Sequence, residues 1–566
     1  MIEGSVKKLG NGKSTICKER RGCFVKREKT KRRTGIVWGA LSLGLLIVLF
    51  SFPAYAMEVA EGWDFTGFIR NNTGLFTGNQ DFTNSGNQLA TERNWLRLKV
   101  DGQILPSLGV RLVGQGIFEP EYKIEEGSTV DFGEYNEADL REAYLTWKPL
   151  DGQKMIVGRQ IVTWGESLAF RVGDVINPQD GRFAFSFANL EDTRIPQWMV
   201  RGVHQITSAR SSFEWIFNPL LTEAKYRVDP IFAEPTSATV SADGKTFTPG
   251  WRFAIYPETR LRQPYTTTTP LAPGQLLGVP FARSVSYYTP IPFLTPADNY
   301  FTEIPVVRYK HPDGGHTFKD LRFGGRTSTT IGGYQFGAFY WHTQEYTPVI
   351  ERGKTYGSND LGAAINPLLA GLWVVPNREY IIRYPEVNIL GAYINKDMPL
   401  GVLRSEVTYR PRRTYNTLDP AEPSALVKRD NLQYLLAWDI QTMFRPLSET
   451  GTIDINLEYY GNWIIGNAKY LNVAGYLTPV RKDDHTFLFN IGTGFDYDKY
   501  HVGVTFIHNV QNNGAVMPSV KYVPDAFNKA CSFELKYIGV YGRNDFEGMG
   551  LFRQKSMVVL TSQFSW

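Results

Sequence analysis

The segment TIDINLEYY, residues 452–460, alternates between polar and apolar side chains. Ile453, Ile455 and Leu457 fall on one parity, and Asp454 falls on the other. A period of two residues is the mark of a β-strand whose two faces meet different surroundings. The sequence therefore predicts a long strand here, with one apolar face and one polar face.

The same alternation occurs in the segment before it and at the C-terminus. It runs through NLQYLLAWDIQTMF, residues 431–444, and through the final stretch SMVVLTSQFSW, residues 556–566. A soluble β-sandwich also alternates, but its strands are usually shorter and its outer faces meet water. Long strands repeated along the chain favour an outer-membrane β-barrel.

The composition agrees with many strands joined by turns. The chain of 566 residues is 42% hydrophobic and 14% aromatic, has 53 glycines and has a mean hydropathy of -0.26. These values are too polar for a bundle of membrane helices. After the N-terminal region no uncharged run is as long as a membrane helix, so a membrane location would have to use strands.

Short turns and long connections recur along the chain. Tight turns rich in Pro, Gly, Asp or Asn occur at 105–109, 148–154, 395–401, 445–451 and 497–500, and long polar connections occur at 77–90, 120–137, 344–381, 412–429 and 464–483. Bacterial outer-membrane barrels have short turns on the periplasmic side and long loops outside.

The number of strands follows from this alternation of short turns and long connections. With 317–325 and 331–343 as a periplasmic hairpin, and 515–522 as a short strand, the count is about 18. We therefore predict an all-β fold, a transmembrane antiparallel up-and-down β-barrel of about 18 strands (16 to 18), formed by one domain over residues 57–566.

The last strand ends on an aromatic residue. Phe564 and Trp566 share one parity of the final stretch. A closed barrel has no free edge only if its last strand pairs with its first, and a terminal aromatic residue is characteristic of barrels that the assembly machinery recognises. We predict that Phe564 and Trp566 form this assembly signal.

The N-terminal 56 residues are expected to be a signal peptide. Residues 1–34 hold twelve Lys and Arg against three Glu, so without this segment the net charge of +5 falls to near -4, and the basic pI gives no indication of nucleic-acid binding. The apolar run 35–50 is followed by Ala54-Tyr55-Ala56, which fits a signal-peptidase site. Cleavage near Ala56 is the prediction, and a retained membrane anchor is the alternative.

Two regions interrupt the alternation and are predicted to be long insertion loops, 162–194 and 220–316. The second contains many of the chain's 32 prolines, which central strands exclude. It could fold inward as a constriction or outward as a lid.

The first region carries a resemblance to a known family. Its residues Gly158-Arg159-Gln160, Trp164-Gly165-Glu166-Ser167, Asn177-Pro178-Gln179-Asp180 and Arg194-Ile195-Pro196 closely resemble the signature of the domain of unknown function 1302 (DUF1302) family. The resemblance implies a Gram-negative outer-membrane barrel.

Eight charged residues gather in and beside that signature. They are Arg159, Glu166, Arg171, Asp174, Asp180, Glu191, Asp192 and Arg194. Such charges cannot face lipid, so we expect them to line the lumen or a loop folded into it. They could form a constriction whose opposed charges select solutes, or an ion-pair network that fixes the loop to the wall. The sequence leaves both interpretations open.

The sequence has no complete catalytic or metal-binding motif of the common types. GNGKST, residues 10–15, lacks the first glycine of a phosphate-binding loop, GESLA, residues 165–169, lacks the second glycine of a nucleophile elbow, and the seven histidines have no metal-binding spacing. The run Asp483-Asp484-His485 has the residue types of outer-membrane proteases, but we interpret it as a solvated loop tip. No enzyme activity, cofactor or metal is predicted.

The predicted function is an outer-membrane, porin-like channel that passes a solute. The alternative is a plugged barrel that acts as an anchor or partner in envelope traffic of lipid or hydrophobic compounds. A hydrolase, the third possibility, would need a nucleophile and base that the sequence does not show. The expected partners are outer-membrane lipid, the barrel-assembly machinery and an unidentified solute, without nucleic acid. A homotrimer is the default assembly, and periplasmic or lipoprotein partners suit the alternative.

Overall fold

The computed structural model covers the strands and several of their connections. It describes residues 57–77, 89–120, 136–167, 169–180, 190–219, 239–240, 247–248, 304–309, 321–346, 349–360, 374–417, 419, 421–446, 448, 451–472, 480–525, 529–543, 549–550 and 556–566. The predicted signal peptide, residues 1–56, and most of the predicted loop 220–316 lie outside the described residues.

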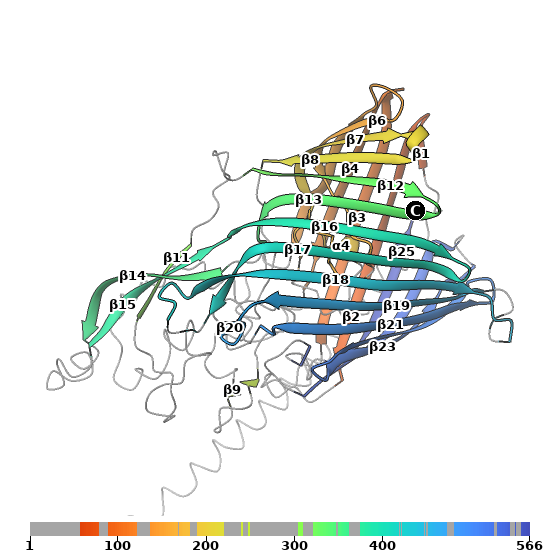
Figure 1. The fold of residues 1–566 in the computed structure, drawn as a ribbon. Helices are drawn as coiled ribbons and strands as arrows, with labels where there is room; N and C mark the ends of the chain where they lie inside the picture. Colours follow the sequence, from red (N-terminus) through yellow and green to blue (C-terminus); the bar gives the residue numbers. More distant parts are fainter. Residues whose placement is uncertain are drawn as a thin grey trace, which may run out of the picture.

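The described residues form a closed antiparallel barrel of 18 strands (Figure 1). In order around the wall these are β2 (Trp63–Phe76), β3 (Leu89–Leu105), β4 (Leu108–Phe118), β5 (Glu137–Trp147), β6 (Gln153–Gln160), β7 (Gln197–Ile206), β8 (Ser211–Asn218), β12 (Arg322–Ile331), β13 (Tyr334–Gln344), β16 (Glu386–Met398), β17 (Gly401–Thr417), β18 (Leu426–Thr442), β19 (Ile453–Ile465), β21 (Asp483–Phe495), β22 (Tyr500–Asn509), β23 (Asn513–Tyr522), β24 (Cys531–Gly542) and β25 (Met557–Ser565). Strand β2 pairs with both β3 and β25, which closes the barrel. The predicted fold class is confirmed.

The two segments on which the strand count depended are strands as predicted. β12 and β13 form a hairpin through Gly332 and Gly333, whose φ angles of 58° and 78° require glycine in a tight turn. The predicted short strand 515–522 lies within β23.

Smaller elements lie outside the wall order. They are β1 (Met57–Ala60), α4 (Leu190–Thr193), the 3-10 turn η2 (Thr207–Ala209), β9 (Thr239–Val240), β10 (Phe247–Thr248), β11 (Ile304–Tyr309), β14 (Val349–Asp360), β15 (Val374–Arg383) and β20 (Leu471–Asn472). Figure 1 shows β11, β14 and β15 beyond the end of the barrel wall, where they form a three-stranded sheet. None of the helices in the described residues is long and apolar enough to cross a membrane.

Three segments predicted to be connections or loops contain strands. The interval 344–381 holds most of β14 and β15, and the interval 220–316 holds β11. Pro305 is tolerated in β11 because this strand lies at a sheet edge, where a missing N–H costs no ladder bond. The run Asp483 to His485 begins strand β21 and is not a loop tip.

Burial in the wall is inverted relative to a soluble protein. Leu457 on β19 is 36% exposed, whereas its neighbours Asn456 and Glu458 are 6% and 3% exposed. The same holds on β18, where Leu436 is 49% exposed and Asn431 is fully buried. On these two strands apolar side chains cover the outer face and polar side chains face the interior, which is the arrangement of a membrane barrel.

The barrel closes at the C-terminal residue. Gly67 and Trp566 exchange two backbone hydrogen bonds of 3.1 Å, one in each direction. A Cβ atom on Gly67 would lie 2.6 Å from the Trp566 ring, so the ring covers this glycine closely. The Phe564 and Trp566 rings are 6.0 Å apart. Both aromatic residues belong to the closing seam, and their role as an assembly signal stays a prediction.

Candidate channel constriction

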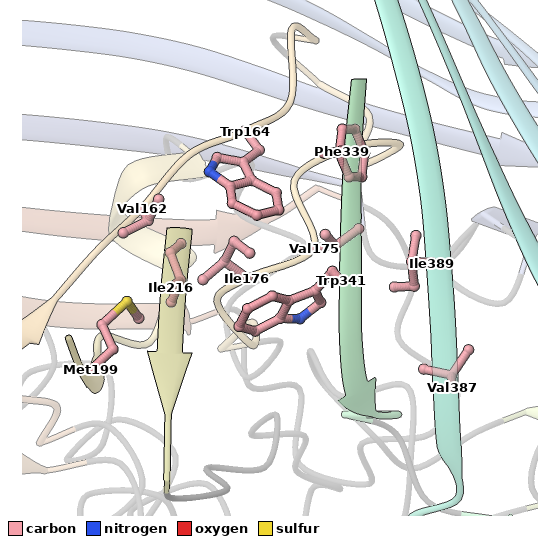
Figure 2. Close-up of a cluster of buried hydrophobic side chains, with 10 residues drawn as sticks. All are labelled: Val162, Trp164, Val175, Ile176, Met199, Ile216, Phe339, Trp341, Val387 and Ile389. Atoms are coloured by element: carbon pink, nitrogen blue, oxygen red, sulfur yellow. The ribbon is translucent and has the colours of Figure 1, made fainter. Parts of the chain in front are cut away.

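The connection between β6 and β7 folds into the barrel. We call residues 161–196 the inward segment; the structure describes all of it except 168 and 181–189. Trp164 and Ile176 of this segment are fully buried. They pack against inward-facing side chains of β7, β8, β13 and β16 in a cluster of ten residues (Figure 2): Val162, Trp164, Val175, Ile176, Met199, Ile216, Phe339, Trp341, Val387 and Ile389.

Trp164 is the central side chain of this cluster. Its ring centroid lies 5.5 Å from that of Phe339 and 5.9 Å from that of Trp341, the latter at an interplanar angle of 78°. Figure 2 shows the three aromatic side chains between the segment and β13. Edge-to-face packing of this kind adds to the stabilisation from apolar burial.

Three glutamates of the wall accept hydrogen bonds from the inward segment. The Trp164 indole N–H donates to Glu214 on β8 over 2.9 Å, and the Ser167 hydroxyl donates to Glu458 on β19 over 2.7 Å. The Glu166 backbone N–H lies 3.4 Å from a carboxylate oxygen of Glu406 on β17. Because all three glutamates are buried, these bonds form away from bulk water and fix the segment to distant strands.

The other arm of the segment binds the opposite wall. Asp192 forms ion pairs with Arg70 on β2 at 2.8 Å and with Arg97 on β3 at 2.9 Å. Arg141 on β5 donates to the backbone oxygen of Glu191 over 2.5 Å. Burial alone would raise the pKa of Asp192, but the charges of Arg97 and Arg70 outweigh it and hold this pKa below its ordinary value.

The two arms are joined by a compact network. Asp174 accepts hydrogen bonds from Arg171 at 3.1 Å and from Arg194 at 2.8 Å. The backbone N–H of Asp180 donates to Thr193 over 2.6 Å. These contacts hold residues near 174–180 against residues near 193–195, so the segment behaves as one folded unit.

The inward segment crosses the lumen. Its contacts reach β5 at one end and β19 at the other. These strands are nine steps apart in the order of 18, through β6, β7, β8, β12, β13, β16, β17 and β18. Nine steps are half the circumference, so the segment spans the barrel from one side to the other.

Most of the chain matches the model of a protein family. The family described as "Protein of unknown function (DUF1302)" matches residues 114–532, which include the inward segment and all but three of the wall strands in full or in part. The chain belongs to the DUF1302 family. No curated protein matches it significantly.

Several solved outer-membrane channels are similar to this DUF1302 protein in fold. OccAB3 of Acinetobacter baumannii has 8% sequence identity and a TM-score of 0.43, with 90% of this chain and 100% of that chain covered. OccK9 (OpdG) of Pseudomonas aeruginosa has 10% identity and a TM-score of 0.41, with 89% and 98% covered. OpdK of Pseudomonas aeruginosa, solved with vanillate, has 9% identity and a TM-score of 0.40, with 89% and 99% covered.

Seven of the eight charged residues predicted as constriction candidates in this DUF1302 protein belong to the inward segment. All seven make contacts given above through side chain or backbone, and the Glu166 carboxylate also accepts a hydrogen bond from Asn395 at 3.1 Å. Arg159 differs, because it lies in β6 opposite Trp198, which is 50% exposed on the outer face. Arg159 pairs with Asp139 at 2.5 Å, and strand alternation places it on the outer face.

The residues that bind the inward segment and that sequence patterns missed lie on the wall. They are Arg70, Arg97, Arg141, Glu214, Glu406 and Glu458. Each is a charged residue on the inward parity of its strand, which is the signal that could have singled them out. Among the described residues, no group of three or more His, Cys, Asp or Glu side chains is placed to hold a metal ion.

Proposed function

We propose that this DUF1302 protein is a channel of the Gram-negative outer membrane that passes a small hydrophilic solute, with the inward segment as its constriction. The observation that carries the proposal is a segment fixed to opposite walls of a closed 18-strand barrel. A barrel with this number of strands encloses a space wide enough for water. The inward segment would therefore set the width of the passage.

The charges around the segment support selectivity. Arg70, Arg97 and Arg141 approach it from β2, β3 and β5, while carboxylates approach it from β8, β17 and β19. Glu214 is itself paired with Arg201 and Arg326, which reduces the negative charge on its side. Fixed charges on opposite sides of a narrow passage select solutes by charge and dipole.

Reversal potentials across a salt gradient test this proposal. The double variant Arg70→Gln, Arg97→Gln removes two positive charges and leaves Asp192, so the selectivity should shift toward cations. Lys148→Gln, in the short turn between β5 and β6, is the control and should leave the potential unchanged. An open channel whose potential does not move in the double variant would contradict the role of these arginines.

A second candidate function rests on a different part of the lumen wall. Inward-facing side chains near the ends of β2 and β3 and on β23, β24 and β25 form an apolar cluster: Phe76, Ala90, Ala515, Met517, Ile538, Val540, Met557 and Val559. Porin interiors are usually polar, whereas this part of the inner wall is apolar and is covered, with Met549 packed against it. This favours a plugged barrel in lipid or hydrophobic-compound traffic, which would be folded but silent in a bilayer.

Location and assembly follow from the same proposal. We infer that residues 1–56 direct export and are removed near Ala56, leaving one barrel domain, 57–566, which the assembly machinery recognises through Phe564 and Trp566. A homotrimer is the proposed assembly for the channel, and periplasmic or lipoprotein partners belong to the second candidate. Neither proposal includes a catalytic step or a cofactor.

A further inference from the structure

A tyrosine reaches a histidine across a glycine on the outer face of the barrel. Tyr434 on β18, Gly461 on β19 and His485 on β21 are successive partners in register. The Tyr434 hydroxyl lies 3.4 Å from Nδ1 of His485. A Cβ on Gly461 would lie 2.2 Å from the Tyr434 ring, so only glycine leaves room for the ring to cross. The Tyr459 hydroxyl lies 2.9 Å from the same Nδ1.

The same three-strand arrangement occurs again on β22, β23 and β24. His508, Gly514 and Tyr541 are successive partners in register, and the Tyr541 hydroxyl lies 2.8 Å from Nδ1 of His508. A Cβ on Gly514 would lie 2.6 Å from that hydroxyl. Each imidazole is also stacked on an aromatic ring, His485 on Tyr459 at 5.8 Å and His508 on Phe506 at 5.9 Å. The repetition on separate strands indicates a built feature.

Both histidines face outward at the same rim. On β21, Phe487 and Phe489 share the parity of His485 and are 47% and 38% exposed. On β22, Phe506 shares the parity of His508 and is 36% exposed. His485 is close to the first residue of β21 and His508 is next to the last residue of β22, while the short turn 496–499 joins the other ends of these strands. The turn 510–512 beside His508 is also short, but the other connections at this end of the barrel include the long ones 77–88, 119–136, 161–196 and 466–482. Long connections mark the extracellular side, so the histidines lie at the extracellular boundary of the membrane.

The hydrogen bonds at Nδ1 leave the other ring nitrogen, Nε2, for a ligand. A phenol hydroxyl that donates to Nδ1 requires the imidazole proton to be on Nε2. Within the described part of the chain, the hydrogen bonds of both imidazoles are made at Nδ1. In the tautomer in which the phenol donates to Nδ1, each ring has an Nε2–H that can donate to a ligand at the level of the lipid headgroups.

Exposed basic residues stand near both sites. Lys482 directly precedes β21, and Arg543 follows Tyr541 by two residues at the end of β24. Asp483 lies beside Lys482 in the sequence and offsets its charge, so the net positive charge is larger at the His508 site. Basic side chains and N–H donors at this level suit an anionic headgroup.

We propose that the two histidine sites bind the phosphate groups of the glycolipid in the outer leaflet. The Nε2–H groups donate to phosphate oxygens, Arg543 and Lys482 supply charge, and the stacked aromatic rings hold each imidazole in place. This inference concerns the outer surface and stands whether or not the barrel conducts.

The test measures binding of diphosphorylated lipid A to the refolded mature barrel, with the dephosphorylated lipid as the reference. Native mass spectrometry in detergent counts bound lipids, and heat-dependent gel migration confirms folding. Asparagine keeps a hydrogen-bonding group near the position of Nδ1 but has none at the position of Nε2. The variants are therefore His485→Asn, His508→Asn and their combination. His501→Asn is the matched control, because His501 lies on β22 at the opposite end and on the opposite parity.

Wild type and the His501→Asn control should bind the diphosphorylated lipid about tenfold more tightly than the reference. The double variant should lose this preference for the diphosphorylated lipid, and His508→Asn alone should reduce the preference more than His485→Asn. Arg543→Gln, an exposed change that leaves both histidines in place, should lose part of it. Equal binding of the two lipids by wild type, or a full preference in the folded double variant, would overturn the proposal.

Discussion

Replacing Trp164 with alanine should release the inward segment without unfolding the barrel. Trp164 is fully buried, packs on Phe339 and Trp341, and donates to Glu214. Removing a buried tryptophan costs about 3–5 kcal/mol. None of the wall's ladder bonds passes through residue 164, so this cost falls on the docking of the segment rather than on strand pairing.

The expected magnitude is large enough to measure in two ways. A loss of 3–5 kcal/mol raises the ratio of undocked to docked segment by about a hundredfold or more. Trp164→Ala should therefore show larger or more frequent openings in a planar bilayer. Its amides at Val162 and Ile195, which bond to Asn177 and Pro178, should exchange hydrogen faster than in wild type.

Trp198→Ala is the matched control for this experiment. Trp198 is 50% exposed on the outer face of β7, so its loss leaves the packing of the segment in place. If both variants fold and Trp164→Ala keeps the conductance and exchange rates of Trp198→Ala, then the reasoning about the inward segment is refuted.

Three further changes test other parts of the structure. Gly67→Ala should destabilise the closed barrel by about 1–3 kcal/mol and so lower its yield on refolding, because the added Cβ would lie 2.6 Å from the Trp566 ring. Gly116→Ala, whose Cβ would have nothing within 4 Å, should refold normally. Ser167→Ala should speed hydrogen exchange at Ala169 and Phe170, whose amides lie 3.1 and 2.6 Å from the serine oxygen, and unchanged rates would contradict the contact. Since the pKa of Asp192 is lowered, its ion pairs with Arg70 and Arg97 are complete above the ordinary pKa value and are lost as pH falls through the lowered one, so the change in conductance that depends on Asp192 should occur only below about pH 4. In Asp192→Asn this acid transition should disappear, and a transition below pH 4 that persists in the variant would contradict its assignment to Asp192.

The wall of the barrel could be predicted from the sequence because strand alternation is a local property. Ile453 and Leu457 reveal their face through their immediate neighbours, and glycine pairs such as Gly332-Gly333 reveal turns in the same way. Strand β11 escaped this reasoning because proline excludes only central strands, and β11 lies at an edge.

The contacts of the inward segment could not be predicted. Glu166 meets Glu406 across 240 positions of sequence, and Ser167 meets Glu458 across 291. No local pattern specifies which inward-facing carboxylate a distant loop will reach. Arg159 was grouped with the loop because of its charge, although it lies within β6, where alternation determines its face.

Single-channel recording of the refolded wild-type protein in a planar bilayer tests the central claim most directly. A solute channel narrowed by the inward segment predicts steady openings, with a conductance well below that of an unobstructed 18-strand pore. A bilayer that stays silent, with protein shown to be a folded barrel, would contradict the channel and favour a plugged barrel that works with partners.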